Sequence, residues 1–433
     1  MLILGTQGLA LLAVFAINVL ISRAFGEAGK GAVALLINSA EVMVIFAHLA
    51  LGTSSQYFVG KQLASPRQLS GNFLFFPIML LLALLSLAGL TWPLWSAQVP
   101  ASAWVVIGPA IPLALLMLIY EPSCQLLIAI GRVGLRSVLV LVQNGLVLLA
   151  VLLAVLALPF GVQSVIWGYV AAFALTVALV LRQMSAVCGA PAAPSWRLLR
   201  ATMGYGGWIY AANLIGHFAA RIDFFIVTAL AGIQAGGVYS VAMGLTSPIT
   251  IIVSSVNSIF YPRTTGETDD ETRRTTPFFY RQMLLLLLVT AAGVALLARP
   301  VLGIFGPGFL AGHAALLYLL TAAVFRGVNG ILTSHLLGRG YPHVKTILTS
   351  VMLALMALGC WLLIPALGMK GAAISAAASG AVENTVLLVL YARVGGGEVR
   401  ELYNFRRGDF VAIIVEGRSF LKRLGDGWGK RGA

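Results

Sequence analysis

Long apolar runs, separated by short polar turns, fill most of this chain. A transmembrane helix needs about 20 apolar residues, and the runs are long enough to predict twelve such spans. They are expected at residues 2–24, 32–60, 72–92, 103–130, 137–158, 163–182, 204–230, 236–262, 279–298, 313–337, 345–364 and 370–393. Because backbone groups in lipid must hydrogen-bond internally, such runs form helices. The pattern predicts an all-α integral membrane protein.

The same pattern occurs twice, at an offset of about 206 positions. Gly26 in ISRAFGEAGKGAVAL corresponds to Gly232 in VTALAGIQAGGVYSV. Further landmarks match in order: Gly131-Arg132 with Gly338-Arg339, Leu158-Pro159 with Ile364-Pro365, and Gly161 with Gly368. A nearly constant offset indicates two copies of one six-helix unit. Since six is even, both copies enter the membrane the same way round, as in transporters built from parallel repeats.

This repeat predicts the domain organisation. We expect an N-terminal six-helix bundle over residues 1–182, a cytoplasmic loop between the bundles over 183–203, a second bundle over 204–393 and a basic cytoplasmic tail over 394–433. The loop is placed by the proline- and arginine-bearing stretch Val187–Arg200. In the tail, Asp409–Leu424 is typical of a basic amphipathic segment on the inner membrane surface, with a partly disordered tail as the alternative.

Composition and charge agree with a membrane protein. The 433 residues are 60% hydrophobic and 10% charged, whereas soluble domains are roughly 25% charged. The net charge of +14 could suggest a nucleic-acid partner, but the basic residues gather in loops and the tail on one side. With both termini inside, the outer side holds only Arg23, Lys30, Arg299 and Lys370. The asymmetry predicts cytoplasmic termini and no nucleic-acid binding.

Ionisable side chains within the spans are the candidates for function. A charge at the centre of a span costs about 2.5–3.5 kcal/mol on insertion scales, so such residues usually face a cavity or a partner. They are Glu41, His48, Glu121, His217, Arg221, Asp223, Arg326, His335 and Glu383. Several depart from the repeat, since Arg221 corresponds to Phe15 and Arg326 to Ile119. The repeat supplies the scaffold, and these departures are where we expect function.

Two roles are open for these residues. Arginine holds phosphate well in a low-dielectric cavity because its fork binds two oxygens at once. We therefore expect a central substrate cavity lined by Arg221, Arg326, Glu41, His48, Glu121 and His217. A buried acid can instead carry a coupling proton, and the candidates for a coupling ion are Asp223, Glu41 and Glu383. The alternative is structural, with Arg–acid pairs joining neighbouring helices.

Enzyme signatures are missing from the sequence. There is no P-loop, HExxH, CxxC pair or GxSxG. The three cysteines, Cys124, Cys188 and Cys360, are far apart and indicate neither a disulfide framework nor a metal site. We therefore expect a protein that is not an enzyme and that needs no cofactor or metal.

Four segments carry a resemblance to a known family. SRAFGEAGKGAVAL (Ser22–Leu35) and ARIDFFIVTALAGIQAGGVYSVA, followed by Pro262, resemble the first hairpin and the seventh and eighth helices of the polysaccharide transporter family. GRGYPHVK (Gly338–Lys345) and LIPALGMKGAAIS (Leu363–Ser375) resemble its eleventh-helix region. This family comprises the Wzx-type lipid-linked oligosaccharide flippases and shares a superfamily with the MATE multidrug exporters. The likeness covers residues 1 to about 393.

The resemblance implies a function and a mechanism. A polyprenyl-pyrophosphate-linked oligosaccharide would be moved from the inner to the outer leaflet of a bacterial inner membrane, for surface polysaccharides such as O-antigen or exopolysaccharide. Alternating access of the two bundles, H⁺ or Na⁺ coupling and a glycan polymerase as a partner would accompany it. Arg221 and Arg326 would hold the phosphates or the glycan, and the acids would bind the coupling ion.

Two other functions remain open at this stage. A MATE-like antiporter of organic cations typically has an acid in its first helix, where this chain has only Gln7 and Asn18. A membrane-embedded glycan polymerase or ligase would be expected to show a sizeable outer loop with catalytic charges, and the outer loops here are short.

Overall fold

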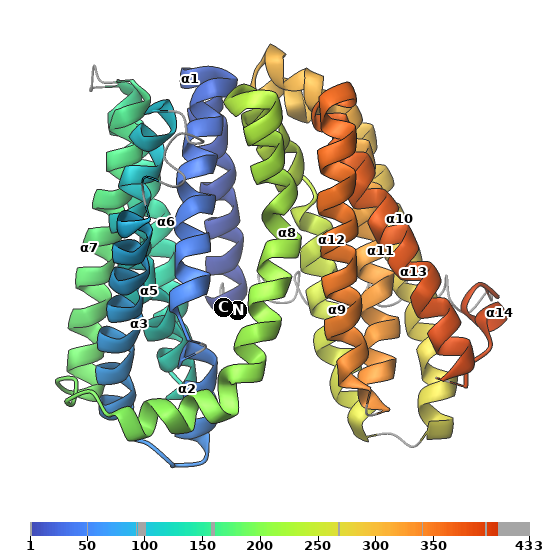
Figure 1. Ribbon diagram of the computed structural model, residues 1–433, viewed down its shortest axis with the longest axis horizontal. Helices are drawn as coiled ribbons and strands as arrows, with labels where there is room; N and C mark the ends of the chain where they lie inside the picture. The colour runs from blue at the N-terminus through green and yellow to red at the C-terminus, as the bar shows by residue number, and fades with distance from the viewer. Residues whose placement is uncertain are drawn as a thin grey trace, which may run out of the picture. The chain divides into compact units, whose positions relative to one another are not determined.

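Helices make up almost all of the described structure (Figure 1). The computed structural model describes residues 2–49, 51–91, 93, 101–156, 161–266, 269–339, 341–394 and 396–405. The helices of the first half are α1 (Leu2–Ala47), α2 (Leu51–Gly60), α3 (Pro66–Leu90), α5 (Ala101–Ala129), α6 (Val133–Leu156) and α7 (Val162–Cys188). They are followed by α8 (Trp196–Gly244), α9 (Ser247–Gly266), α10 (Asp269–Phe305), the short 3₁₀ helix η2 (Pro307–Gly312), α11 (His313–Gly338), α12 (Pro342–Leu367), α13 (Met369–Arg393) and α14 (Val399–Leu402). The expected all-α membrane architecture is confirmed.

Ten helices in the described part of the chain are long and apolar enough to cross a membrane. Two of them, Gly8–Ala47 and Asn213–Gly244, are interrupted by a glycine with non-helical backbone. At a rise of about 1.5 Å per residue, the 40 residues of Gly8–Ala47 are long enough for two crossings of a hydrocarbon layer of about 30 Å. The expected count of twelve spans stays a prediction.

The interrupting glycines lie at matching places in the two halves. Gly26 (φ 64°, ψ −164°) breaks α1 and Gly232 (φ 88°, ψ 168°) breaks α8. The second matched pair has even more similar backbone angles: Gly161, before α7, has φ 59° and ψ −140°, and Gly368, before α13, has φ 57° and ψ −142°. Glycine adopts such left-handed conformations without the steric cost of a Cβ. These backbone angles support the internal repeat at both landmarks.

The chain divides into two compact units, Met1–Arg221 and Ile222–Ala433. In the first unit α5 packs against α1, α2, α3 and α7, and α6 packs against α7. In the second, α11 packs against α9, α10 and α13, and α12 packs against α13. The packing of α5 against α2, α3 and α7, and of α6 against α7, thus has a counterpart in the packing of α11 against α9, α10 and α13, and of α12 against α13. The division into bundles at residues 182 and 204 stays a prediction, and residues 204–221 lie in the first unit.

A short segment between α7 and α8 is fastened to α3. The expected loop over 183–203 is shorter in the structure, because α7 continues to Cys188 and α8 begins at Trp196. Arg67 donates from Nε to the carbonyl of Ala190 (3.0 Å), and its own carbonyl accepts from the Ala192 amide (2.9 Å). We call residues 189–195 the strap.

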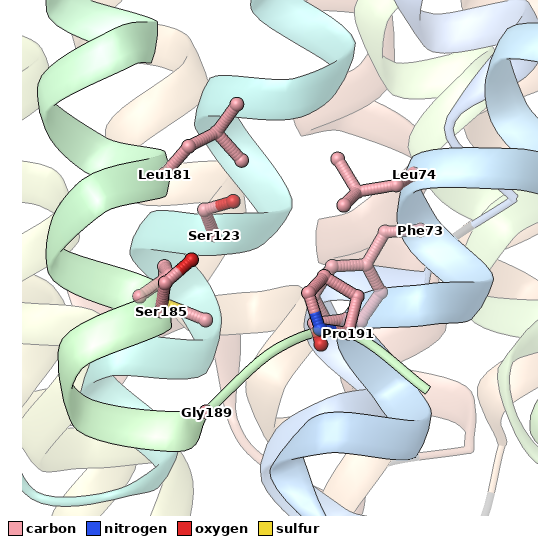
Figure 2. A pocket seen from close by; sticks show the side chains of 9 residues that line it. Phe73, Leu74, Ser123, Leu181, Ser185, Gly189 and Pro191 are labelled. Atoms are coloured by element: carbon pink, nitrogen blue, oxygen red, sulfur yellow. The ribbon is translucent and has the colours of Figure 1, made fainter. Parts of the chain in front are cut away.

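A small pocket lies under the strap. Figure 2 shows Phe73 and Leu74 of α3, Ser123 of α5 and Leu181 of α7 around it, with the strap passing across one side. Its water-accessible space has room for about one water molecule. The pocket belongs to the packing of the strap and is too small for an organic substrate.

Two expectations about polar segments need correction. The expected spans 236–262 and 279–298 leave a loop between them, but α9 extends to Gly266 and α10 already begins at Asp269. Lys30, expected in an outer loop, is 6% exposed within α1 and donates a hydrogen bond to Asn18 Oδ1. Since a buried ammonium needs an acceptor, this contact explains how the interior accommodates it. The predicted amphipathic segment Asp409–Leu424 lies outside the described residues.

The described end of the chain is bound to the second unit. Arg281 donates from Nη1 to the carbonyl of Glu401 (2.6 Å), and the hydroxyls of Tyr280 and Tyr403 are 3.0 Å apart. Leu402 is fully buried beside them. These contacts hold α14 against α10.

Candidate functional site

An acid, an arginine and a histidine meet inside the first unit. Arg221 Nη2 lies 3.2 Å from Glu41 Oε2, and His217 Nε2 lies 4.0 Å from the same oxygen. Glu41 comes from α1, and the other two are one turn apart on α8, so they share a helix face. The three side chains are between 23% and 36% exposed. The sequence-predicted residues Glu41, His217 and Arg221 thus form one cluster of partly buried side chains.

Aromatic contacts set the approach of α8 to α1 at this cluster. The Tyr210 hydroxyl donates to the carbonyl of Phe46 (2.6 Å). His48 packs edge-on against the Tyr210 ring at 5.5 Å, and Phe46 packs in the same way against Phe218 at 5.5 Å. His48 is therefore placed at the end of α1 next to α8, in electrostatic range of His217. The aromatic contacts position the charged groups on the two helices.

A second acid and a second arginine adjoin the cluster. Glu121 of α5 lies within electrostatic range of both Glu41 and Arg136. Arg136 belongs to the first turn of α6, and its Nε is buried and without a hydrogen-bond partner among the described residues. One helix turn beyond Glu121, Gln125 Oε1 accepts a hydrogen bond of 2.9 Å from Gln56 Nε2 of α2. The first unit therefore holds two acids and two arginines in electrostatic contact.

Arg136 was expected in a cytoplasmic loop, because the helix was predicted to start at residue 137. In fact α6 begins at Val133, directly after the turn at Gly131 (φ 77°). The Gly131-Arg132 turn, which is one landmark of the repeat, was the sequence signal that could have indicated an earlier start of α6. Arg136 is the charged residue of this site that the sequence did not assign.

The predicted residues Asp223, Glu383 and Arg326 lie in the second unit. Asp223 is 5% exposed, and its Oδ2 accepts a 2.7 Å hydrogen bond from Tyr239, on the far side of the Gly232 break. Glu383 of α13 accepts a 3.0 Å hydrogen bond from Asn329 Nδ2 of α11. The Oδ1 atom of Asn329 in turn accepts a hydrogen bond from Asn384. Each acid is held by neutral donors from a neighbouring segment, as is typical of buried carboxylates.

Arg326, one turn before Asn329, is exposed, and it lies in electrostatic range of Glu383 and Tyr239. Arg326 belongs to the second unit, whereas the Glu41 cluster belongs to the first. Among the described residues, no group of three or more His, Cys, Asp or Glu side chains could hold a metal ion.

The geometry of the Glu41 cluster suits an exchangeable anion. The 3.2 Å contact between Arg221 and Glu41 lacks hydrogen-bond alignment, since no hydrogen bond to Glu41 Oε2 is formed within the described chain. The pair is therefore Coulombic, and the partly exposed guanidinium keeps donors available for phosphate or carboxylate oxygens. A ligand that offers two oxygens could compete with Glu41 for Arg221.

Comparison with known families confirms the resemblance to the polysaccharide transporter family of the MOP/MATE superfamily. A family described as "Polysaccharide biosynthesis protein" matches residues 136–307. This match spans α6 to the start of η2, and so includes Arg221 and Asp223. Comparison with curated protein sequences finds no match.

Solved structures share the fold along nearly the whole chain. The inward closed lipid II flippase MurJ has a TM-score of 0.74 at 11% identity, covering 96% of this chain and 92% of its own. An inward-facing multidrug resistance MATE transporter of the MOP superfamily has a TM-score of 0.73 at 15% identity. That match covers 89% of this chain and 94% of the transporter. A MOP superfamily transporter from Pyrococcus furiosus, reported with a binding pocket of reverse polarity, has a TM-score of 0.59 at 15% sequence identity, and the match covers 94% of each chain. The chain is a multi-pass membrane protein with a MATE- and MurJ-like fold.

Proposed function

We propose that this protein is a flippase for a polyprenyl-pyrophosphate-linked oligosaccharide, moving it from the inner to the outer leaflet of a bacterial cytoplasmic membrane. The family match and the MATE- and MurJ-like fold point to a transporter or lipid-linked flippase and away from catalysis. The product of such transport feeds surface polysaccharide synthesis, of which O-antigen and exopolysaccharide are examples. A glycan polymerase is then a natural partner.

The observation that carries the proposal is the pairing of Arg221 with Glu41 inside a bundle of apolar helices. Insertion scales put the cost of an arginine at the centre of a span at about 2.5–3.5 kcal/mol, so its presence there calls for a partner or a ligand. A guanidinium binds two phosphate oxygens at once, and the partial exposure of Arg221 leaves its donors reachable. A pyrophosphate is the anion that fits this chemistry in a polysaccharide transporter.

The wider mechanism belongs to the same proposal. Twelve spans in two parallel six-helix bundles, with both termini in the cytoplasm, would alternate access to the two leaflets. Arg326 would contribute a second cation to the substrate path, and Asp223 or Glu383 would bind a coupling H⁺ or Na⁺. The hydrogen bonds from Tyr239 and Asn329 hold these two carboxyl groups in place.

The test is transport in liposomes. Purified protein is reconstituted with a fluorescent undecaprenyl-pyrophosphate oligosaccharide, and the fraction accessible in each leaflet is followed over time. Protein-dependent movement is expected, with at least a tenfold loss of rate in Arg221→Ala and little change in the exposed control Arg197→Ala. Loss of folded protein in Arg221→Ala would instead support a structural role for the Glu41 pair. No movement with wild-type protein would refute the flippase.

A multidrug antiporter is the second candidate, because a MATE transporter has the same fold. An antiporter of organic cations needs uncompensated acids in its cavity, whereas Glu41 here is compensated by Arg221. Proton-driven efflux of ethidium from the same liposomes, without movement of the lipid-linked glycan, would establish this second function.

A further inference from the structure

We infer that Glu41 binds a proton when Arg221 is engaged by the pyrophosphate, so that substrate binding and proton uptake occur at one cluster of the first unit. This inference rests on the proposed function and adds to it the group that exchanges the proton. It separates Glu41 from the other two coupling-ion candidates, Asp223 and Glu383, which lie in the second unit.

Arg221 is the main charge partner of Glu41. The Nη2–Oε2 distance is 3.2 Å, and the next nearest cationic candidate, His217, is 4.0 Å away. Glu41 Oε2 accepts no hydrogen bond from the described residues. The carboxylate therefore has no neutral donor on this oxygen that would stabilise its charge if the arginine turned away.

Other charges also face Glu41. On α5, Glu121 interacts with it electrostatically and is in turn compensated by Arg136 of α6. On α8, the facing groups are His217 and Arg221, and His48 at the end of α1 interacts with His217. With neutral histidines, the two acids and two arginines sum to zero. Among these described groups, no positive charge is in excess to neutralise an incoming anion.

A bound pyrophosphate changes the charge around Glu41. A pyrophosphate that is esterified at both ends carries two negative charges and competes for the same guanidinium. Once Arg221 binds phosphate oxygens, Glu41 faces a like charge within a few ångströms in a low-dielectric interior. Like charges at such distances strongly favour the neutral form of a carboxyl group. One proton then passes from solvent to the Glu41 carboxylate, Arg221 keeps its charge, and the neutral carboxyl can donate to a phosphate oxygen.

The experiment counts protons on binding. The full chain in nanodiscs is titrated with farnesyl-pyrophosphoryl-N-acetylglucosamine, a diester whose charge is constant near neutral pH. Calorimetry at one pH in buffers of different ionisation enthalpy gives the number of protons taken up. We expect about one proton per ligand for wild-type protein. Glu41→Gln should bind with equal or higher affinity and take up no proton, whereas the exposed control Glu398→Gln should match wild type.

Each outcome bears on the inference. Binding by wild-type protein without proton uptake would overturn it and leave the flippase standing. Failure of wild-type protein to bind the diester would overturn it together with the pyrophosphate-binding role of the site. Uptake that persists in Glu41→Gln but disappears in His217→Gln would assign the proton to His217 and overturn the choice of Glu41. If Glu41→Gln does not fold, the infrared band of a protonated carboxyl, gained on ligand binding by wild-type protein, decides.

Discussion

Asn72 and Ser195 exchange two hydrogen bonds and so join α3 to the start of α8. Asn72 Nδ2 donates to the carbonyl of Ser195 (3.1 Å), and the Ser195 amide donates to Asn72 Oδ1 (2.8 Å). Asn72 is fully buried. Because one amide side chain satisfies both backbone groups at the end of the strap, this pair fixes where α8 begins relative to the first unit.

The first prediction is that Asn72→Ala lowers the free energy of unfolding by about 1–3 kcal/mol, since two backbone groups lose their partner. Asn72→Asp keeps the acceptor but places a carboxyl group against the Ser195 carbonyl in a fully buried position, so it should cost at least as much as Asn72→Ala. Thermal unfolding in detergent micelles measures both. The control is Asn144→Ala, which removes only a bond from Asn144 Nδ2 to the Val140 carbonyl of its own helix. Equal melting temperatures for Asn72→Ala and wild type would show that the pair does not hold the strap.

The second prediction concerns the close approach of the strap to α3. A Cβ placed on Gly71 would lie 2.0 Å from the carbonyl oxygen of Ala192. That oxygen belongs to backbone and cannot rotate away, so Gly71→Ala should destabilise the protein by about 1–3 kcal/mol or more through overpacking. Gly89→Ala is the matched control in α3, because no atom lies within 4 Å of the position that its methyl group would take. If the two variants melt together, the strap does not pack against Gly71.

The third prediction concerns the buried pair Asp223 and Tyr239. Tyr239 is fully buried and donates 2.7 Å to Asp223 Oδ2. Tyr239→Phe should lower the free energy of unfolding by about 1–3 kcal/mol, since the buried carboxyl group of Asp223 loses a hydrogen-bond donor. In a double-mutant cycle with Asp223→Asn the two changes should be coupled, because both act on one contact. Tyr318→Phe, at an exposed tyrosine, is the control. Strict additivity would show that the pair does not stabilise the fold.

The sequence anticipated the features that depend on local chemistry. The apolar runs predicted the helices, and the glycines at 26, 161, 232 and 368 marked the breaks between them. A backbone with positive φ favours glycine at that position whatever the rest of the fold is. The ionisable residues Glu41, His217 and Arg221 were candidates because charges are costly in lipid. These arguments need no knowledge of which helices are neighbours.

What the sequence could not supply is contact between distant segments. The pairing of Glu41 with Arg221 joins positions 180 residues apart, and no pattern in the sequence of either helix indicates that the two helices are neighbours. Arg136 was missed because helix ends are uncertain by a few residues, and that margin decides whether it lies in a loop or in α6. Asn72 was missed because its partners in the strap are backbone groups, which no residue type marks.

The last prediction tests the repeat through Gly161 and Gly368, which share φ near 58° and ψ near −141° (59° and 57°, −140° and −142°). Apart from the adjoining residues, no atom of the described chain lies within 4 Å of the position a Cβ would take at either glycine, so an alanine meets only the strain of its own backbone. Non-glycine residues in such sparsely populated conformations cost about 1–3 kcal/mol each. Gly161→Ala and Gly368→Ala should therefore lower the free energy of unfolding by similar amounts within that range. Gly145→Ala, inside α6 and equally unobstructed, should instead stabilise by about 0.5–1 kcal/mol. Chemical unfolding in micelles compares the three. A cost at one glycine and none at the other would show that the two turns are not equivalent and would remove this support for the repeat.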